Sequence, residues 1–168
     1  EKYESGKSSF YMQVNQFAAH TEEERQRLFG ARLPSSASAR AEYPNPIKSN
    51  PRGGSENNVS KVDWRATGKV SSVKNQGQCG SCWAFSATGA VEGLYAIQTG
   101  RLVDFSEQDI VDCDTGGDGC GGGEMQQAFS FIRDSGICLE KDYIYNGVEG
   151  ECKCCTEAYK IQGSRSVS

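Results

Sequence analysis

The sequence of 168 residues lacks two features that would place it in other classes of protein. It has no apolar run long enough to cross a bilayer or to form the core of a signal peptide. It also has no excess of positive charge, since its formal net charge is −4 and its basic residues are scattered. We therefore expect a soluble protein that binds neither nucleic acid nor membrane.

Cysteine is absent from the first 78 residues, and all eight cysteines lie between Cys79 and Cys155. This density is typical of a disulfide framework that forms in an oxidising compartment. Because the chain starts at Glu1 without a methionine, the lack of a leader does not argue against that compartment. The sequon Asn58-Val59-Ser60 agrees with the same route. We expect a lysosomal or extracellular protein.

Proline is scarce, and all four prolines lie within residues 31–57, a stretch that is also rich in Ser, Asn and Gly. This composition predicts an exposed linker that is open to proteolysis. Before the linker, Thr21 and Glu24 have the spacing of a capping box. They predict a short helix that ends near Gly30.

Residues 58–168 contain three further helix patterns. The first runs from Ser81, as a capping residue, to Gly100, and a largely buried apolar set marks it: Trp83, Ala84, Ala87, Ala90, Val91, Leu94 and Ile97. Ser106 and Asp109 form a second capping box. The third helix places Met125, Ala128, Phe129 and Ile132 on one face and ends at Gly136. The glycine-rich stretch "CDTGGDGCGGG" predicts a loop, and short strands are expected around 143–145 and 159–161.

Cys79 and Cys82 stand two residues apart at the expected start of the first of these helices. A redox pair is one interpretation, but no apolar strand runs into Cys79, because "VSSVKNQGQ" is polar. A zinc site is another, with Cys152, Cys154 and Cys155 as further ligands, but Cys-x-Cys-Cys is a poor zinc spacing. Neither alternative is favoured.

A third interpretation gives the two sulfurs different roles. Cys82 lies in the first turn of the helix, where free N–H groups and the helix dipole favour the nucleophilic thiolate form. Gln76 and the backbone N–H of Cys82 could together stabilise an oxyanion. Cys79 could meanwhile hold the loop through a disulfide. This combination predicts acyl transfer.

Four blocks, "QGQCGSCWAFSATGAVEG", "FSEQDIVDC", "GCGGGEMQQAF" and "DYIYNGVEGEC", resemble the papain and cathepsin L family of cysteine proteases. The resemblance implies an α+β fold with two lobes, of which the chain would hold the mainly helical first lobe in residues 58–168. "KVDWRATGKVSSVKNQG" resembles the start of a mature enzyme, and "GKSSFYMQVNQFAAHTEEER" resembles the tail of an inhibitory propeptide, with Ala19 where an Asp is expected. The propeptide part would span residues 1–30, and residues 31–57 would form the linker and maturation region.

The resemblance also implies the site residues. Cys82 is the expected nucleophile and Gln76 the oxyanion-hole residue of a cysteine endopeptidase that acts through a thioester. Gly80, Gly122 and Gly123 would contact the substrate backbone, as in strand addition, and Glu124 and Met125 would meet a substrate side chain. Alternatively, Met125 is part of the core and Glu124 a solvated charge.

The same resemblance implies disulfides between Cys79 and Cys120 and between Cys113 and Cys152. It leaves Cys138, Cys154 and Cys155 unassigned. It implies no cofactor and no metal. The expected partners are peptide substrates, the chain's own propeptide and cystatin-type inhibitors, and the expected state is a monomer.

A protease of this kind also needs a catalytic His and Asn far downstream of its nucleophile. The only histidine here is His20, in the propeptide-like segment. We therefore expect an incomplete precursor that is inactive by itself. The alternative function is a non-catalytic lobe or propeptide-type inhibitor that binds other proteases.

Overall fold

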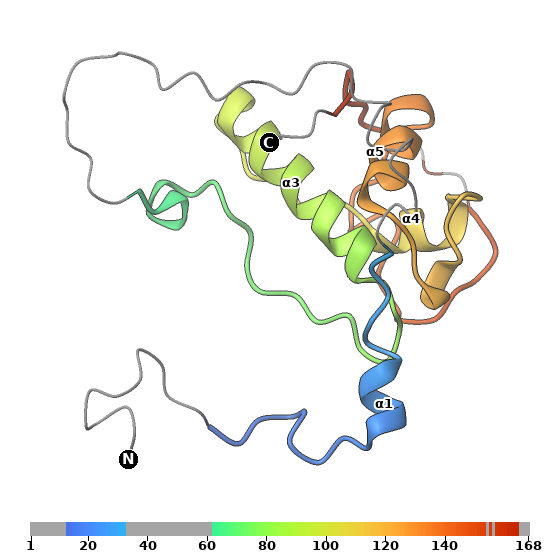
Figure 1. Cartoon of the computed structure of the whole chain (residues 1–168). Coiled ribbons are helices and arrows are strands. Elements are labelled where there is room, and N and C mark those ends of the chain that lie inside the picture. The colour runs from blue at the N-terminus through green and yellow to red at the C-terminus, as the bar shows by residue number, and fades with distance from the viewer. Residues whose placement is uncertain (1–12, 33–61, 154, 156, 165–168) are drawn as a thin grey trace, which may run out of the picture.

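The computed structural model of the chain describes residues 13–32, 62–153, 155 and 157–164. Its helices are α1 (Glu22–Gln26), α3 (Cys82–Thr99), α4 (Glu107–Cys113) and α5 (Met125–Asp134), with 3-10 turns η1 (Trp64–Thr67) and η2 (Gly119–Gly121). Figure 1 shows α4 and α5 on one side of the long helix α3 and the segment that contains η1 on the other. No helix in the described ranges is long and apolar enough to cross a membrane.

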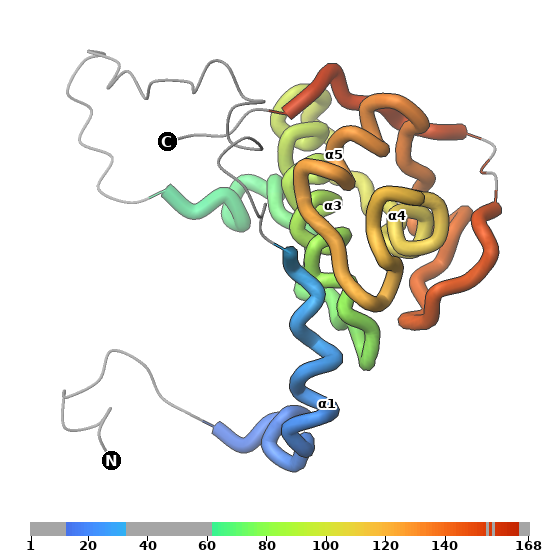
Figure 2. Tube along the Cα trace, turned by 45° about the vertical axis from the view of Figure 1, so that its right-hand side comes forward, coloured from blue at the N-terminus to red at the C-terminus, as the bar shows by residue number. Residues whose placement is uncertain are grey.

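Helix α3 carries the core of the domain on one side only. Trp83, Ala84, Ala87 and Val91 are buried against α4 and α5. The prediction of a largely buried helix was wrong for its other flank, which leaves Ala90, Leu94 and Ile97 exposed. The reason is the packing, because α4 and α5 both contact the same side of α3, as Figure 2 also shows.

The helix begins where the sequence predicts, but Ser81 does not cap it with its side chain. The Ser81 hydroxyl lies 2.7 Å from the hydroxyl of Tyr145 instead. Ser81 therefore stabilises the start of α3 by tying it to a distant loop, where a capping hydrogen bond to the helix backbone was expected.

Helices α4 and α5 complete the core with Ile110, Ala128 and Ile132, all fully buried. Met125 and Phe129 are half-buried against the same cluster, as the predicted face of α5 requires. In α4, the Ser106 hydroxyl accepts the N–H of Asp109, which confirms half of the predicted capping box. The other half is missing because the Asp109 carboxylate accepts the N–H of Cys138 at 2.9 Å.

A buried ion-pair cluster joins α3 to α4. Lys74 Nζ lies 2.8 Å from a carboxylate oxygen of Glu92 and 2.8 Å from one of Glu107, whose side chains are 1% and 2% exposed. Burial acts to lower the pKa of Lys74, but its hydrogen bonds to both carboxylates outweigh that effect and raise the pKa. Burial raises the pKa of Glu107 to about 7, although Lys74 opposes the change.

Strands are reduced to isolated bridges in the part of the chain that the structure describes. Tyr159 pairs with Ile137 in one antiparallel bridge, within the range where a short strand was expected. The strand expected at 143–145 is absent, because side chains occupy its backbone groups. Glu140 accepts the N–H of Tyr145, and the Ser106 hydroxyl donates to the carbonyl of Tyr143.

The N-terminal segment that the structure describes comprises residues 13–32. The predicted linker from residue 33 onward lies outside the described residues. The capping box of the N-terminal segment is confirmed, since Thr21 and Glu24 each accept the other's backbone N–H. Helix α1 ends at Gln26, earlier than the predicted end near Gly30. Residues 27–29 continue as a turn with hydrogen bonds back to α1, and residues 30–32 then pair with Gly123 in the glycine-rich loop. Figure 1 shows this stretch as the blue chain rising from α1.

Candidate active site

Cys82 is the first residue of α3, and its thiol is free and partly exposed. The loop before it turns tightly, because the Asn75 side chain accepts the N–H of Gly77 at 3.0 Å. The sulfur of Cys79 is bonded to Cys120, and the N–H of Gly80 donates to the carbonyl of Cys120 at 2.9 Å. Trp83, in the first turn of α3, also donates its ring N–H to the carbonyl of Gly119 at 3.3 Å. The start of α3 is therefore fixed to the glycine-rich loop by one disulfide and two hydrogen bonds.

The side-chain amide of Gln76 uses both of its N–H groups. It donates to the carbonyl of Cys79 at 2.8 Å and to the carbonyl of Leu28 at 3.1 Å. The backbone carbonyl of Gln76 accepts the hydroxyl of Tyr145 at 2.7 Å. Gln76 is thus held on both sides and directs one donor at a peptide carbonyl of the N-terminal segment.

The glycine-rich loop binds that segment by its backbone. The N–H of Gly123 donates to the carbonyl of Gly30, and the N–H of Arg32 donates to the carbonyl of Gly123, both at 2.8 Å. Ala31 and Gly123 accordingly form a parallel bridge. This arrangement is strand addition, the binding mode expected for Gly123 with an extended peptide.

Two contacts allow glycine only. A Cβ atom on Gly30 would lie 1.5 Å from the carbonyl oxygen of Gly80, and one on Gly122 would lie 2.4 Å from the carbonyl oxygen of Gly30. Such distances are far inside van der Waals contact. The absence of side chains at these positions therefore lets the two backbones touch.

The remaining expected substrate residues lie at the start of α5. Glu124 is half-buried and lines an open hollow of about 480 Å³ together with Arg32, Gln126 and Gln127. Met125 does not line this hollow and packs against the hydrophobic core. Its role as a substrate contact stays a prediction, and so does the alternative that it is part of the core.

Sequence reasoning missed several contributors to this site: Leu28, Gly30, Arg32, Asp118 and Tyr145. Arg32 Nη2 lies 2.7 Å from an Asp118 carboxylate oxygen and 3.1 Å from the carbonyl oxygen of Gly121. Arg32 is separated from both Asp118 and Gly121 by more than 80 positions in the sequence. The one local signal for Asp118 is its place in the loop, two residues before Cys120.

Two further disulfides support the loops around the site. Cys113 bonds to Cys152, and Cys138 bonds to Cys155, a pairing that the sequence left open. With Cys79 bonded to Cys120, a redox pair of Cys79 and Cys82 is not formed. The zinc interpretation fails for the same reason, because Cys79 and Cys152 are both in disulfides.

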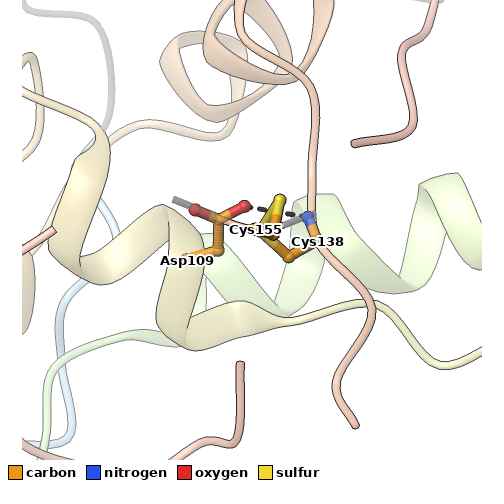
Figure 3. A group of neighbouring side chains, drawn as sticks. All are labelled: Asp109, Cys138 and Cys155. Carbon is orange, nitrogen blue, oxygen red and sulfur yellow. Dashed lines mark hydrogen bonds between the residues drawn. A yellow bond between two sulfur atoms is a disulfide. The ribbon is translucent and has the colours of Figure 1, made fainter. Parts of the chain in front are cut away.

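Asp109 lies beside the third disulfide, and its carboxylate and the two sulfurs are within 4.8 Å of one another. Figure 3 shows the carboxylate turned toward the backbone N–H of Cys138. Burial raises the pKa of Asp109 to about 6, and the negative charge of Asp112 adds to the effect. Since both sulfurs are spent in the disulfide, the group forms a structural contact and offers no pair of thiolates to a metal.

A family model described as papain family cysteine protease matches residues 59–168. Cysteine endopeptidase RepA of Oryza sativa subsp. japonica is 44% identical over 160 residues, which cover 88% of this chain and 40% of that protein. Procathepsin L of Rattus norvegicus is 43% identical over 157 residues, covering 90% of this chain and 44% of that protein.

Among solved structures, the proform of the ragweed pollen allergen Amb a 11, a cysteine protease, superposes with a TM-score of 0.72 at 38% identity. The match covers 96% of this chain and 52% of that one. The chain thus spans about 40% of the length of the curated relatives cited here. With the family model matched over the greater part of its length, this chain belongs to the papain family of cysteine proteases.

Proposed function

We propose that the chain is part of the precursor of a cysteine endopeptidase in which Cys82 is the nucleophile. The observation that carries this proposal is the free thiol of Cys82 at the start of α3, among cysteines that are held in disulfides. Six residues earlier in the sequence, the side-chain amide of Gln76 already binds a peptide carbonyl. Acyl transfer requires a nucleophilic thiol and a donor that binds a peptide carbonyl, and Cys82 and Gln76 supply these two groups within one short stretch of chain.

In the proposed reaction, the Cys82 thiolate attacks the carbonyl carbon of the scissile peptide bond. The negative charge on the carbonyl oxygen is stabilised by the side-chain N–H of Gln76 and the backbone N–H of Cys82. Collapse of this intermediate breaks the C–N bond, releases the amine after protonation, and leaves a thioester on Cys82. Water then hydrolyses the thioester to the acid and restores the thiol.

The thiol proton has to pass to a general base and then to the leaving amine. The one histidine of the chain, His20, lies in the N-terminal segment with its ring against Phe17. We therefore place the activity in a longer parent protein, and we expect no peptide hydrolysis from the 168-residue polypeptide alone.

We further propose that the N-terminal segment is an inhibitory propeptide. Support comes from Leu28, whose carbonyl occupies the Gln76 amide, and from residues 30–32, which occupy the backbone groups of Gly123. A substrate would need the same donors and acceptors. Release of the segment, by cleavage within residues 31–57, is then required before a substrate binds.

The proposed setting is the secretory pathway, with a lysosomal or extracellular destination. The three disulfides support it, because such bonds persist in oxidising compartments. Proposed partners are peptide and protein substrates, the propeptide, and cystatin-type inhibitors, and the proposed state is a monomer.

The test is to express the longer parent protein, with and without Cys82→Ala, and to follow cleavage of a fluorogenic peptide after removal of the N-terminal segment. Alkylation of the active parent should block cleavage, and peptide mapping should locate the adduct on Cys82. Hydrolysis that survives both Cys82→Ala and alkylation would overturn the proposal.

A further inference from the structure

The hydroxyl of Tyr145 reaches the stretch of chain that leads into α3. It donates to the backbone carbonyl of Gln76 at 2.7 Å and lies 2.7 Å from the hydroxyl of Ser81. Because its single proton is used on the Gln76 carbonyl, the serine hydroxyl must be the donor in the second bond. One tyrosine, 64 positions from Ser81 in the sequence, thus joins the two ends of the loop 76–81.

The two ends of this loop carry the two groups that the proposed function assigns to the oxyanion. Gln76 offers its side-chain N–H, and Cys82, the residue after Ser81, offers its backbone N–H. Donors stabilise an oxyanion strongly only when their positions are fixed before the charge develops. A contact that holds Gln76 next to Ser81 therefore fixes the separation of the two donors.

Tyr145 is itself held in place by its neighbours. Its backbone N–H donates to the Glu140 carboxylate at 2.9 Å, and the next N–H, of Asn146, donates to the side chain of Gln108 in α4 at 2.9 Å. Its ring meets the ring of Phe85, in the first turn of α3, edge to face with the centroids 4.9 Å apart. The phenol is therefore placed by α3 and α4, and it does not need a bound peptide to reach the loop.

The hydroxyl of Tyr145 works as a hydrogen-bond donor and not as an acid or base of the reaction. Burial raises the pKa of Tyr145, the hydrogen bond with Ser81 opposes this change, and the negative charge of Glu107 adds to it. A phenol with a pKa above its usual value of about 10 keeps its proton at neutral and acidic pH. Among the described contacts it makes no hydrogen bond with the Cys82 thiol. Its influence on the reaction has to pass through the groups that it holds.

We infer that Tyr145 is a positioning residue, whose hydroxyl sets the separation of the two oxyanion donors by tying the carbonyl of Gln76 to the hydroxyl of Ser81. The effect on hydrolysis rests on the proposed function, since Gln76 and Cys82 are assigned their roles there. The effect on the loop does not, because both hydrogen bonds are present in the 168-residue chain itself. The two effects can be measured separately.

Hydrogen exchange in the 168-residue protein tests the effect on the loop. Tyr145→Phe keeps the ring against Phe85 and removes only the hydroxyl. The amides of Gly77 and Gly80, which are both hydrogen-bonded, should exchange roughly five- to tenfold faster, the change expected for the loss of about one hydrogen bond. Ser81→Ala removes the other hydroxyl and should act in the same direction. The double variant should exchange no faster than the faster single variant.

Tyr143→Phe is the matched control, because it removes a hydroxyl that donates to Asp112 at 2.9 Å, two residues away in the same loop. It should leave exchange at Gly77 and Gly80 unchanged. Equal exchange in Tyr145→Phe and the unaltered protein would overturn the inference, and so would additive effects in the double variant. A disulfide map that matches the unaltered protein establishes that each variant is folded.

Kinetics of the parent enzyme test the effect on hydrolysis. Tyr145→Phe should lower kcat about five- to tenfold and leave KM within about twofold, because oxyanion donors act mainly in the transition state. In a Gln76→Ala background the same substitution should cost less than about twofold, since one donor alone has no separation to set. Tyr143→Phe should keep kcat in both backgrounds.

An equal loss of kcat in both backgrounds would make Tyr145 a structural residue only and overturn the inference. An unchanged kcat in Tyr145→Phe would do the same. Either result leaves Cys82 as the nucleophile. Hydrolysis that survives Cys82→Ala would instead remove the proposed function and leave the exchange result standing.

Discussion

The side-chain amide of Gln76 donates a hydrogen bond to the carbonyl oxygen of Leu28 at 3.1 Å. A residue of the N-terminal segment thereby occupies the donor that is proposed to stabilise the oxyanion. The same amide also donates to the carbonyl of Cys79, so its orientation does not depend on Leu28. A peptide carbonyl can therefore be exchanged at this donor without rebuilding the loop.

Substitution of Gln76 should loosen the N-terminal segment. Gln76→Ala removes the donor to Leu28, and a hydrogen bond of this kind contributes about 1 kcal/mol. We expect amides of residues 28–32 to exchange roughly fivefold faster in hydrogen-exchange mass spectrometry. Gln78→Ala is the control, because Gln78 is exposed two residues away. Equal protection in all three proteins would mean that Gln76 does not hold the segment.

Substitution of Gly30 should have a larger effect on the same segment. In Gly30→Ala the new methyl group meets the carbonyl oxygen of Gly80, and a backbone atom cannot rotate away as a side chain can. Overpacking of this kind costs about 1–3 kcal/mol, enough to displace residues 30–32 from Gly123. Limited proteolysis after Arg32 should become faster in this variant. Ala31→Ser, at an exposed neighbour, should leave the proteolysis rate unchanged.

Removal of Lys74 should destabilise the fold as a whole. Lys74→Met leaves Glu92 and Glu107 buried without their cation, and loss of one partner in a buried pair costs about 3–5 kcal/mol. The lower end applies because the Lys74 side chain is 21% exposed. Urea denaturation at pH 7 measures the loss, with Lys141→Met as an exposed control. A change below 1 kcal/mol would mean that solvent already compensates the carboxylates.

Stability should increase as the pH falls from 8 to 5. Burial raises the pKa of Glu107 to about 7 and that of Asp109 to about 6, above the values that these groups have in an unfolded chain. At a pH between the unfolded-state pKa and the folded-state pKa of either group, the folded protein binds more protons than the unfolded protein. The free energy of unfolding therefore falls as pH rises through this range. The contribution is complete below about pH 4 and is lost as pH passes through about 6 and 7.

Urea midpoints between pH 5 and pH 8 measure this dependence. Glu107→Gln should flatten the upper part of the curve, since glutamine does not titrate. Glu157→Gln, at an exposed position, should reproduce the curve of the unaltered protein. A midpoint that rises with pH over this range would contradict the predicted direction.

The third disulfide should contribute measurably to stability. Cys138 and Cys155 are 17 positions apart, and closing a loop of that size is worth about 3 kcal/mol in the chain-entropy account. We expect Cys155→Ser to lower the free energy of unfolding by about that amount. Mass mapping of the unreduced protein should find Cys138 joined to Cys155. A peptide that joins Cys138 to Cys154 instead would contradict the pairing.

Local signals were the most predictable from the sequence. The capping box of Thr21 and Glu24 spans four residues, and it forms as expected because no distant group competes for it. Ser81 is likewise a residue that can cap a helix, but its hydroxyl forms a hydrogen bond with the hydroxyl of Tyr145, 64 positions away. The carboxylate of Asp109 likewise accepts the backbone N–H of Cys138 and is not available for capping. Capping potential is a property of nearby residues, whereas its use depends on tertiary contacts.

The candidate site shows the same division. Cys82 and Gln76 lie within one motif, so their chemistry could be predicted from residue type and spacing. The pair of Arg32 and Asp118 could not, because an exposed charge has many possible partners and these two are 86 positions apart. The exposed flank of α3 was also missed. Apolar spacing predicts which residues share a helix face, but it does not predict which faces receive a neighbour.

We expect the bridge between Ala31 and Gly123 to protect the protein from unwanted association as well. Gly123 turns both its N–H and its carbonyl outward, which is the pattern of an unpaired sheet edge. Such an edge pairs readily with any extended chain, including another misfolding copy. While residues 30–32 are paired with Gly123, no other chain can form hydrogen bonds with this edge. Removal of the N-terminal segment therefore leaves the backbone groups of Gly123 unpaired. A protein that has lost the segment should aggregate sooner than one that keeps the segment.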